Sequence, residues 1–207
     1  GYWVSLYPIS YTSPYRVPNT LTNTHSVYFD GTGDYMDSNF GATTEGDTSA
    51  VLNGDFTISC WAKFDDGQPS SAQWIWGASN AGPQDEVSLQ LTSAGKLSFL
   101  YESDNDGTVA AQTNAAQFAS GATNWCHIAC VLDDTANQMS IFINGESITL
   151  SSTSSYDGDI SSETPANFAT TADMFFGGRN RNGSLDSNPL TGYMDEISVW
   201  NKSMNLY

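Results

Sequence analysis

The chain has 207 residues, of which 39% are hydrophobic and 13% aromatic, enough to form one sizeable core. Lys and Arg number 6 against 23 Asp and Glu, a formal net charge of −17, which excludes the basic surface that nucleic-acid binding requires. No run of about 18 apolar residues occurs, so no membrane insertion is predicted. The acidic composition fits either a soluble surface in salty or extracellular surroundings or Asp and Asn clusters that bind Ca²⁺.

The first 24 residues are predicted to form an extended arm or linker. They contain Trp3, several tyrosines and the prolines Pro8, Pro14 and Pro18, which disfavour helix. Such an aromatic segment is not expected to be stable alone in water, so it is expected to pack on the rest of the chain or on other subunits of a larger assembly. Residues 25–207 are the predicted folded domain, and the chain is interpreted as a mature product or a piece of a longer protein.

From residue 26 onward, short alternating segments predict β-strands separated by turns. Residues 26–38 are interpreted as two short strands around a Gly-rich turn, and residues 55–65 alternate between an inner face with Ile58 and Cys60 and an outer face with Trp61. Further strands are predicted at 73–79, 86–92, 96–103, 124–134, 138–150, 172–178 and 193–200.

The turns and loops complete this pattern. Asn144-Gly145 is the strongest hairpin signal, because both turn positions tolerate positive φ. Residues 41–54, 103–123, 151–171 and 178–191 are predicted as polar loops, and no long segment keeps a helical period with caps. Many short strands with Gly, Asn and Asp turns predict an all-β antiparallel sandwich.

The last predicted strand raises a question. By simple alternation, Asp195 falls on the same face as Ile197 and Val199, so a carboxylate is expected on an apolar strand face. A partly buried carboxylate needs a cation or several hydrogen-bond donors to stay ionised. Asp195 is therefore a candidate for a structural or metal-binding role.

Three cysteines, Cys60, Cys126 and Cys130, leave at least one thiol unpaired. Cys126 and Cys130 lie four residues apart on a predicted strand, roughly 13 Å, which is too far for a bridge between them. Small buried hydrophobic residues are one interpretation, and a Cys60–Cys130 bridge is the other. With only two histidines and no C-x-x-C pair, no zinc site is predicted.

Six segments in order carry a resemblance: "SVYFDGTGDYMDS", "FTISCWAKF", "WCHIACVLD", "MSIFINGE", "MFFGGRN" and "LTGYMDEISVWNKSM". They resemble the laminin G-like jelly-roll domain of the concanavalin A-like lectin/glucanase superfamily, over residues 26 to about 204. The resemblance implies two antiparallel sheets, one concave and one convex, with the N- and C-terminal strands paired. It is a weak guide to function, because the fold serves lectins, adhesion modules, hydrolases and virion proteins.

The resemblance also implies a structural Ca²⁺ where the first turn meets the last strand. Asp30, the Gly31 region and Asp195 would supply its oxygen ligands. The alternatives are that Asp195 accepts backbone N–H bonds from the 30–33 turn without a metal, or that it faces the surface.

Sugar recognition uses aromatic faces together with hydrogen-bonding Asp and Asn side chains. Trp74 and Trp76 share a parity and are candidates, with core packing as the alternative. Trp61, Trp125 and Trp200 lie in motifs that the resemblance assigns to the core. Polar candidates on loops, with plain solvated loops as the alternative, are Asp104, Asn105, Asp106, Asp157, Asp159 and Arg179.

Catalysis is not predicted. Related glucanases carry two catalytic glutamates in a pattern close to E-x-D-x-x-E, whereas Glu102 here begins E-S-D-N-D-G and lacks the second glutamate. The resemblance assigns His127 a structural position, so it is interpreted as a core or sheet histidine. Cys126 is not a candidate nucleophile, because adjacent strand residues face opposite ways and His127 cannot face it.

The sequence therefore predicts a non-catalytic recognition or adhesion domain that binds glycans or a cell-surface protein, in an extracellular or virion-surface setting. The alternatives are a structural surface subunit of a larger assembly such as a virion, and a diverged glycoside hydrolase.

Overall fold

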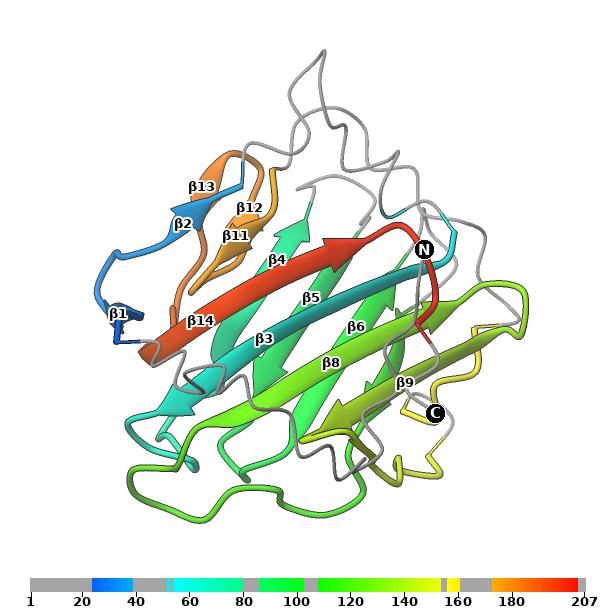
Figure 1. The fold of residues 1–207 in the computed structure, drawn as a ribbon, viewed down its shortest axis with the longest axis horizontal. Helices are drawn as coiled ribbons and strands as arrows, with labels where there is room; N and C mark the ends of the chain where they lie inside the picture. The colour runs from blue at the N-terminus through cyan, green and yellow to red at the C-terminus, as the bar shows by residue number, and fades with distance from the viewer. Residues whose placement is uncertain are drawn as a thin grey trace, which may run out of the picture.

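The computed structural model describes residues 24–38, 52, 54–79, 86–102, 108–153, 156–160 and 173–204. Two β-sheets lie face to face in it, with β14, β3, β8 and β9 in the front layer of Figure 1 and β4, β5 and β6 behind them. The predicted all-β, two-sheet jelly-roll sandwich is confirmed. No helix in these ranges is long and apolar enough to cross a membrane.

The first sheet has six strands, all paired antiparallel with their neighbours. Their order is β1 (Val27–Asp30), β14 (Thr191–Trp200), β3 (Phe56–Phe64), β8 (Cys126–Asp133), β9 (Gln138–Ile143) and β10 (Glu146–Ser147). The pairing of β1 with β14 confirms that the two ends of the domain meet in one sheet.

The second sheet follows the order β13 (Ser184–Leu185), β12 (Asn180–Arg181), β4 (Gln73–Ser79), β5 (Glu86–Leu91), β6 (Leu97–Glu102) and β7 (Thr108–Gln112). β11 (Phe175–Phe176) also pairs with β4 and with β2 (Met36–Asp37). All these pairings are antiparallel except that of β12 with β4, which is parallel.

The core lies between the sheets because alternate side chains of each strand point inward. Phe56, Ile58 and Cys60 of β3 are fully buried, as the alternation predicts, and Phe56 meets Phe99 of β6 edge to face at 6.0 Å between ring centroids. Burial of each such side chain contributes about 2 kcal/mol to stability. Sequence alternation and sheet packing agree here.

The loop predictions were partly wrong. The predicted loop at 103–123 contains β7, and the predicted loop at 178–191 contains β12 and β13. β7 consists mainly of small residues that give no alternating signal, and it is held by its pairing with β6. The Asn144-Gly145 hairpin is confirmed, with φ of 53° and 82° at its two residues.

The three cysteines are free thiols buried in the core. The bridge between Cys60 and Cys130 is therefore not formed, and the interpretation of small buried hydrophobic residues holds. Burial raises the pKa of the Cys126 thiol to about 12. Burial likewise raises the pKa values of Cys60 and Cys130, with smaller contributions from neighbouring cysteines.

Residues after β14 cross part of the outer face of the first sheet. The Thr57 hydroxyl donates to the Lys202 carbonyl at 2.8 Å and accepts from the Met204 N–H at 2.9 Å. Val131 and Phe142 form a small buried apolar cluster with Ala129, and Met204 lies beside them. The segment after β14 is thus held against the first sheet at Thr57.

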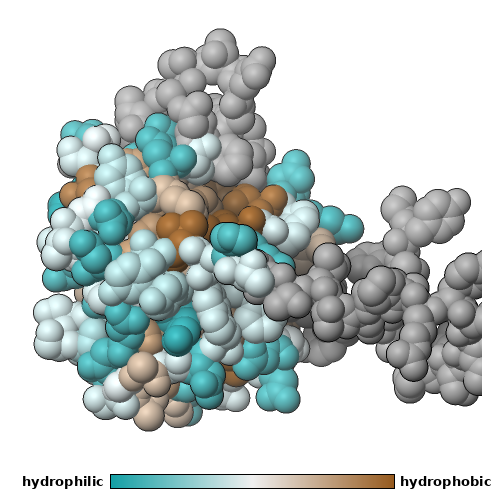
Figure 2. All heavy atoms as spheres, turned by 60° about the vertical axis from the view of Figure 1, so that its left-hand side comes forward, coloured by the Kyte–Doolittle hydropathy of each residue, from teal (hydrophilic) through white to brown (hydrophobic). Residues whose placement is uncertain are grey.

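Figure 2 turns the β1 side of the molecule forward and shows mostly hydrophilic surface on the described residues. A few large hydrophobic side chains are nonetheless exposed, including Val27, Tyr28 and Tyr35. Tyr35 stacks on Phe175 of β11 with ring centroids 4.2 Å apart, so its ring is anchored to the second sheet.

Candidate functional site

A β-bulge in β14 sets the geometry of the candidate site. Asp195 lies opposite Trp61 of β3, but Ser198 lies opposite Ser59, so β14 has one residue more than β3 over this interval. Glu196 takes a φ of +46°, in the left-handed region that non-glycine residues rarely adopt. The bulge changes the alternation between Asp195 and the residues after it.

The prediction that Asp195 shares a face with Ile197 and Val199 is therefore wrong. Asp195 pairs with the outward-facing Trp61, whereas Val199 pairs with the buried Ile58, and Ile197 packs against the core. The extra residue keeps the apolar side chains inward on one side of the bulge and directs the carboxylate outward on the other.

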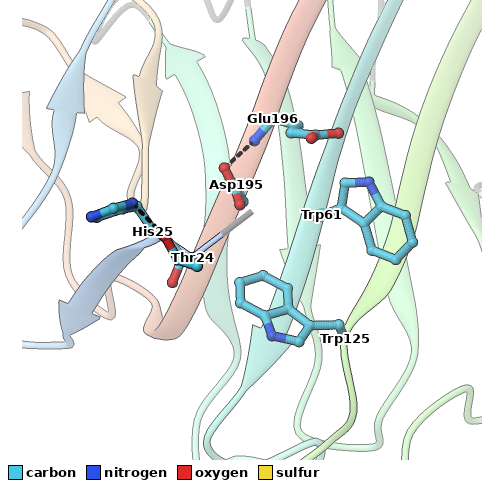
Figure 3. Close-up of a pocket in the computed structure, with 7 residues that line it drawn as sticks. Thr24, His25, Trp61, Trp125, Asp195 and Glu196 are labelled. Atoms are coloured by element: carbon cyan, nitrogen blue, oxygen red, sulfur yellow. Dashed lines mark hydrogen bonds between the residues drawn. The ribbon is translucent and has the colours of Figure 1, made fainter. Parts of the chain in front are cut away.

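Asp195 and Glu196 line a cleft of about 420 Å³ on the outer face of the first sheet. Trp61 and Trp125 form another wall, and Thr24, His25 and Ser26 close the side toward β1. Figure 3 shows the Asp195 carboxylate between the Thr24–His25 segment and the two tryptophans, with Glu196 reaching toward the Trp61 side.

The two tryptophans are both exposed and supported. Trp61 is 37% exposed and Trp125 is 39% exposed. Trp61 packs edge-on against His127 at 5.6 Å between ring centroids, and Trp125 packs against Tyr193 at 6.2 Å. Because each ring is held by an aromatic neighbour, its remaining surface is positioned for contact with a ligand.

The electrostatics of the cleft are acidic. Asp195 Oδ1 accepts a hydrogen bond of 2.8 Å from the Glu196 N–H, which fixes the turn of the bulge. None of the residues that the structure places along the cleft is Lys or Arg.

Burial lowers the pKa of His127, behind Trp61, and the charge of Glu196 opposes this only in part. A lowered pKa favours neutral imidazole at neutral pH.

Two of the predicted ligand-binding residues, Trp74 and Arg179, contact each other on the second sheet. There they belong to a network of ion pairs that is shielded from solvent. The Arg179 guanidinium lies 3.8 Å from the centroid of the half-buried Trp74 ring. It donates to both carboxylate oxygens of Glu86 at 2.6 Å and is paired with Asp186. The side chain of Arg179 is only 11% exposed. This arrangement joins strands rather than presenting a charge to a ligand.

Asp186, one of the acidic partners of Arg179, is held in its ionised form. Burial alone would raise the pKa of Asp186, but hydrogen bonds from Arg179 and the Ser187 N–H hold it below its ordinary value. Glu86 accepts a further hydrogen bond from the Ser88 hydroxyl at 2.5 Å.

The structure corrects the interpretation of Trp76 as a ligand-binding candidate that shares a face with Trp74. Trp74 lies opposite Gln90 and Trp76 opposite Leu89, so Ile75 is an extra residue and a second bulge breaks the shared parity. Trp76 is consequently 1% exposed and packs edge-on against Phe99 in the core. A side chain so buried cannot stack on a sugar.

The loop candidates lie elsewhere. Asp104, Asn105 and Asp106 fall outside the described residues. Asp157 and Asp159 are exposed, and the Asp159 N–H donates to Asp157 Oδ1 at 3.0 Å. Neither lines the cleft.

The predicted calcium ligands are not brought together. Asp30 lies opposite Thr191 in the β1–β14 register, and Asp195 is four residues farther along β14, roughly 13 Å by strand rise. Asp30 Oδ1 instead accepts from the backbone N–H and the hydroxyl of Thr32, both at 2.7 Å, and these bonds lower its pKa. Gly31 sits in that same turn.

The separation has two consequences. Asp30, Gly31 and Asp195 do not fit a shared calcium site, and Asp195 is also too far from the 30–33 turn to accept its N–H groups. Across the described ranges, no group of three or more His, Cys, Asp or Glu side chains is arranged to hold a metal.

The sequence interpretation missed Trp61, Trp125 and Glu196. Alternation alone places Trp61 outward, opposite in parity to Ile58 and Cys60, and this signal was outweighed by the assignment of its motif to the core. No comparable signal marks Glu196, because no Gly or Pro accompanies the bulge.

Residues 30–206 match the family model described as the concanavalin A-like lectin/glucanases superfamily. Among solved structures, the CBM40 domain of the Ruminococcus gnavus IT-sialidase is similar, with 17% identity, a TM-score of 0.63 and coverage of 87% of this chain and 91% of that one. The NanB sialidase from Streptococcus pneumoniae is also similar, at 19% identity and a TM-score of 0.61, with coverage of 87% of this chain and 26% of that one. The chain thus spans about a quarter of that enzyme. A search of curated proteins found no match.

Proposed function

Because the chain belongs to the concanavalin A-like lectin/glucanase superfamily, we propose that it is a non-catalytic glycan-binding module whose site is the cleft between Trp61 and Trp125. The observation that carries this proposal is the bulge of β14, which directs Asp195 and Glu196 into a cleft walled by two exposed tryptophans. The CBM40 domain of the Ruminococcus gnavus sialidase, solved with bound α2,3- and α2,6-sialyllactose, supports glycans as the ligand class.

The chemistry of the cleft suits a sugar. A pyranose ring presents C–H groups that pack on the faces of tryptophans, and its hydroxyl groups donate hydrogen bonds to carboxylates such as Asp195 and Glu196. A volume of about 420 Å³ lies within the range of small-molecule sites. The aromatic neighbours of Trp61 and Trp125 hold the rings before a ligand arrives, which lowers the entropy cost of binding.

Binding without hydrolysis is the better interpretation of the two carboxylates. Glycoside hydrolysis requires carboxyl groups that flank the scissile bond, one acting as the acid and the other as the nucleophile or base. Asp195 and Glu196 are adjacent residues of one strand, and tryptophans rather than carboxylates form the wall across from Asp195. We therefore expect no release of shorter sugars when the protein is incubated with glycans that it binds.

A glycan array, followed by calorimetry on the best ligand, tests the proposal. Trp61→Ala and Trp125→Ala should each weaken binding by about 10–100-fold, as truncation of a central aromatic contact does. Trp200→Ala is the matched control, because Trp200 is 39% exposed on the same sheet but does not line the cleft. Unchanged binding in both cleft variants, or an equal loss in Trp200→Ala, would contradict the proposal.

A further inference from the structure

We infer that the cleft selects glycans that carry a protonated amino group, that is, amino sugars, and rejects acidic glycans. This inference rests on the proposed function, since it concerns the ligand of the same cleft. It follows from three features of the described residues: the signs of the charges in the cleft, the chemistry of its aromatic wall, and the backbone conformation that places Glu196.

Carboxylates predominate among the charged groups of the cleft. Two consecutive carboxylates, Asp195 and Glu196, line it, neither Lys nor Arg is among its described lining residues, and His25 is the basic side chain at its edge. Lys63, the nearest lysine along β3, lies with its Nζ 5.4 Å from the centroid of the Tyr193 ring and is not part of the lining. The hydroxyl groups of a neutral sugar can donate to both carboxylates, whereas an ammonium group would add the attraction between opposite charges to its hydrogen bonds.

The aromatic wall favours the same ligand. The faces of tryptophan rings attract cations through their quadrupole, and tryptophan is the best of the aromatic side chains for this purpose. Trp61 and Trp125 stand beside the two carboxylates in the same cleft (Figure 3). The net charge of −17 adds a long-range field that draws cations toward the protein and repels anions.

The backbone at Glu196 supports a role for its side chain. A strand normally directs consecutive side chains to opposite faces, but here the bulge lets both acidic residues line one cleft. Glu196 adopts its φ of +46° at a conformational cost that glycine would not incur. The strained conformation thus delivers a second carboxylate to the ligand side of the sheet.

The same charges argue against the ligand of the similar CBM40 domain. Sialyllactose carries the carboxylate of its sialic acid, and that group would face Asp195 and Glu196 with neither Lys nor Arg among the described lining residues to offset the repulsion. The shared fold is therefore expected to have a ligand of opposite charge here.

Calorimetry with four probes at about pH 6 tests the inference, because amines are protonated there. The probes are a β-1,4-linked glucosamine tetramer, the N-acetylated form of the same tetramer, α2,3-sialyllactose and choline. The glucosamine tetramer should bind at least about tenfold tighter than its acetylated form, as expected for hydrogen bonds to charged groups. Sialyllactose should not bind, and added salt should weaken binding of the glucosamine tetramer.

Charge-removing variants locate the effect. Glu196→Gln and Asp195→Asn keep the shape of the side chains and should each weaken binding of the glucosamine tetramer by about tenfold or more, with little change for the acetylated tetramer. Glu146→Gln is the matched control, because it removes the same charge from an exposed position on β10, outside the cleft. An equal loss in Glu146→Gln would overturn the inference, since it would show an effect of net charge alone.

The remaining outcomes separate this inference from the proposed function. Equal binding of the two tetramers, lost in Trp61→Ala, would overturn the charge selectivity and leave the glycan-binding proposal intact. Binding of choline but of neither tetramer, dependent on Glu196, would support a cation site and overturn the proposal of a glycan ligand. If no probe binds, the inference on amino sugars falls, and the glycan array decides on the proposed function.

Discussion

Glu196 combines an unfavourable backbone conformation with a place in the candidate site. A residue with a side chain at φ of +46° costs of order 1–3 kcal/mol relative to an unstrained conformation. The Asp195 carboxylate accepts the Glu196 N–H and so compensates part of this cost locally. Function and stability therefore oppose each other at this one residue.

Glu196→Gly should raise the free energy of unfolding by about 1 kcal/mol, because glycine takes positive φ without a steric penalty. It should also weaken binding of the glucosamine tetramer. Urea denaturation measures the first effect. Glu196→Ala is the control: it removes the carboxylate but keeps the strain, so it should not stabilise the protein. A glycine variant no more stable than the alanine variant would refute the idea that the backbone is strained.

On the scale of the elements, the Arg179 network joins parts of the second sheet. Arg179 precedes β12 directly, Glu86 begins β5, and Asp186 follows β13. The side chains of Arg179, Glu86 and Asp186 are 11%, 6% and 13% exposed, so the ion pairs are shielded from water. Removal of the arginine would leave the two shielded carboxylates without a positively charged partner.

Arg179→Met should therefore destabilise the fold by about 3–5 kcal/mol, and Arg179→Met combined with Glu86→Leu should recover part of that loss. Thermal or urea unfolding of both variants measures this. Glycan binding at the Trp61 cleft should persist under native conditions, because the network lies on the other sheet. A single variant as stable as the wild-type protein would show that the buried pairs contribute little.

On the scale of the whole molecule, the sandwich is held by burial rather than by cross-links. The three cysteines are inside the core, and burial raises the pKa of Cys126 to about 12. Raised pKa values keep these thiols protonated and so poorly nucleophilic at neutral pH. The thiols thus act as small hydrophobic side chains. The extracellular or virion-surface location that the sequence predicts stays a prediction.

A thiol-reactive probe at pH 8 should label none of the cysteines in the folded protein and all of them in denaturant. The rate of labelling in native buffer should follow the rate of global opening of the core. Rapid labelling of the native protein would contradict the burial of the thiols. Fewer than three reactive thiols in denaturant without reductant would indicate a disulfide.

Most of the fold could be predicted because burial between two sheets imposes a period of two on the sequence. The alternation around Ile58 and the Asn144-Gly145 turn each gave a correct element. β7 was missed because Ala110 and Ala111, adjacent and equally small, do not distinguish an inner from an outer face. Its strand conformation comes from its pairing with β6, which lies beyond local sequence.

The candidate site was harder to predict, for a different physical reason. Each of two bulges shifts the alternation by one residue, one turning Asp195 away from the core and the other placing Trp76 in it. A bulge depends on which residues face each other across two strands, and no single strand carries that information. The outward position of Trp61, by contrast, could be predicted from alternation alone.

The bulge in β14 has a consequence for how such proteins diverge. Glu196 and Ile197 together stand against the single position of Cys60 in β3, so loss of the codon for Glu196 would restore regular pairing while Met194 and Val199 keep their places in the interior. One deletion would then erase half of the acidic pair without repacking the sandwich. Within a lineage, preference for basic or neutral sugars could switch in one genetic step on an otherwise unchanged scaffold.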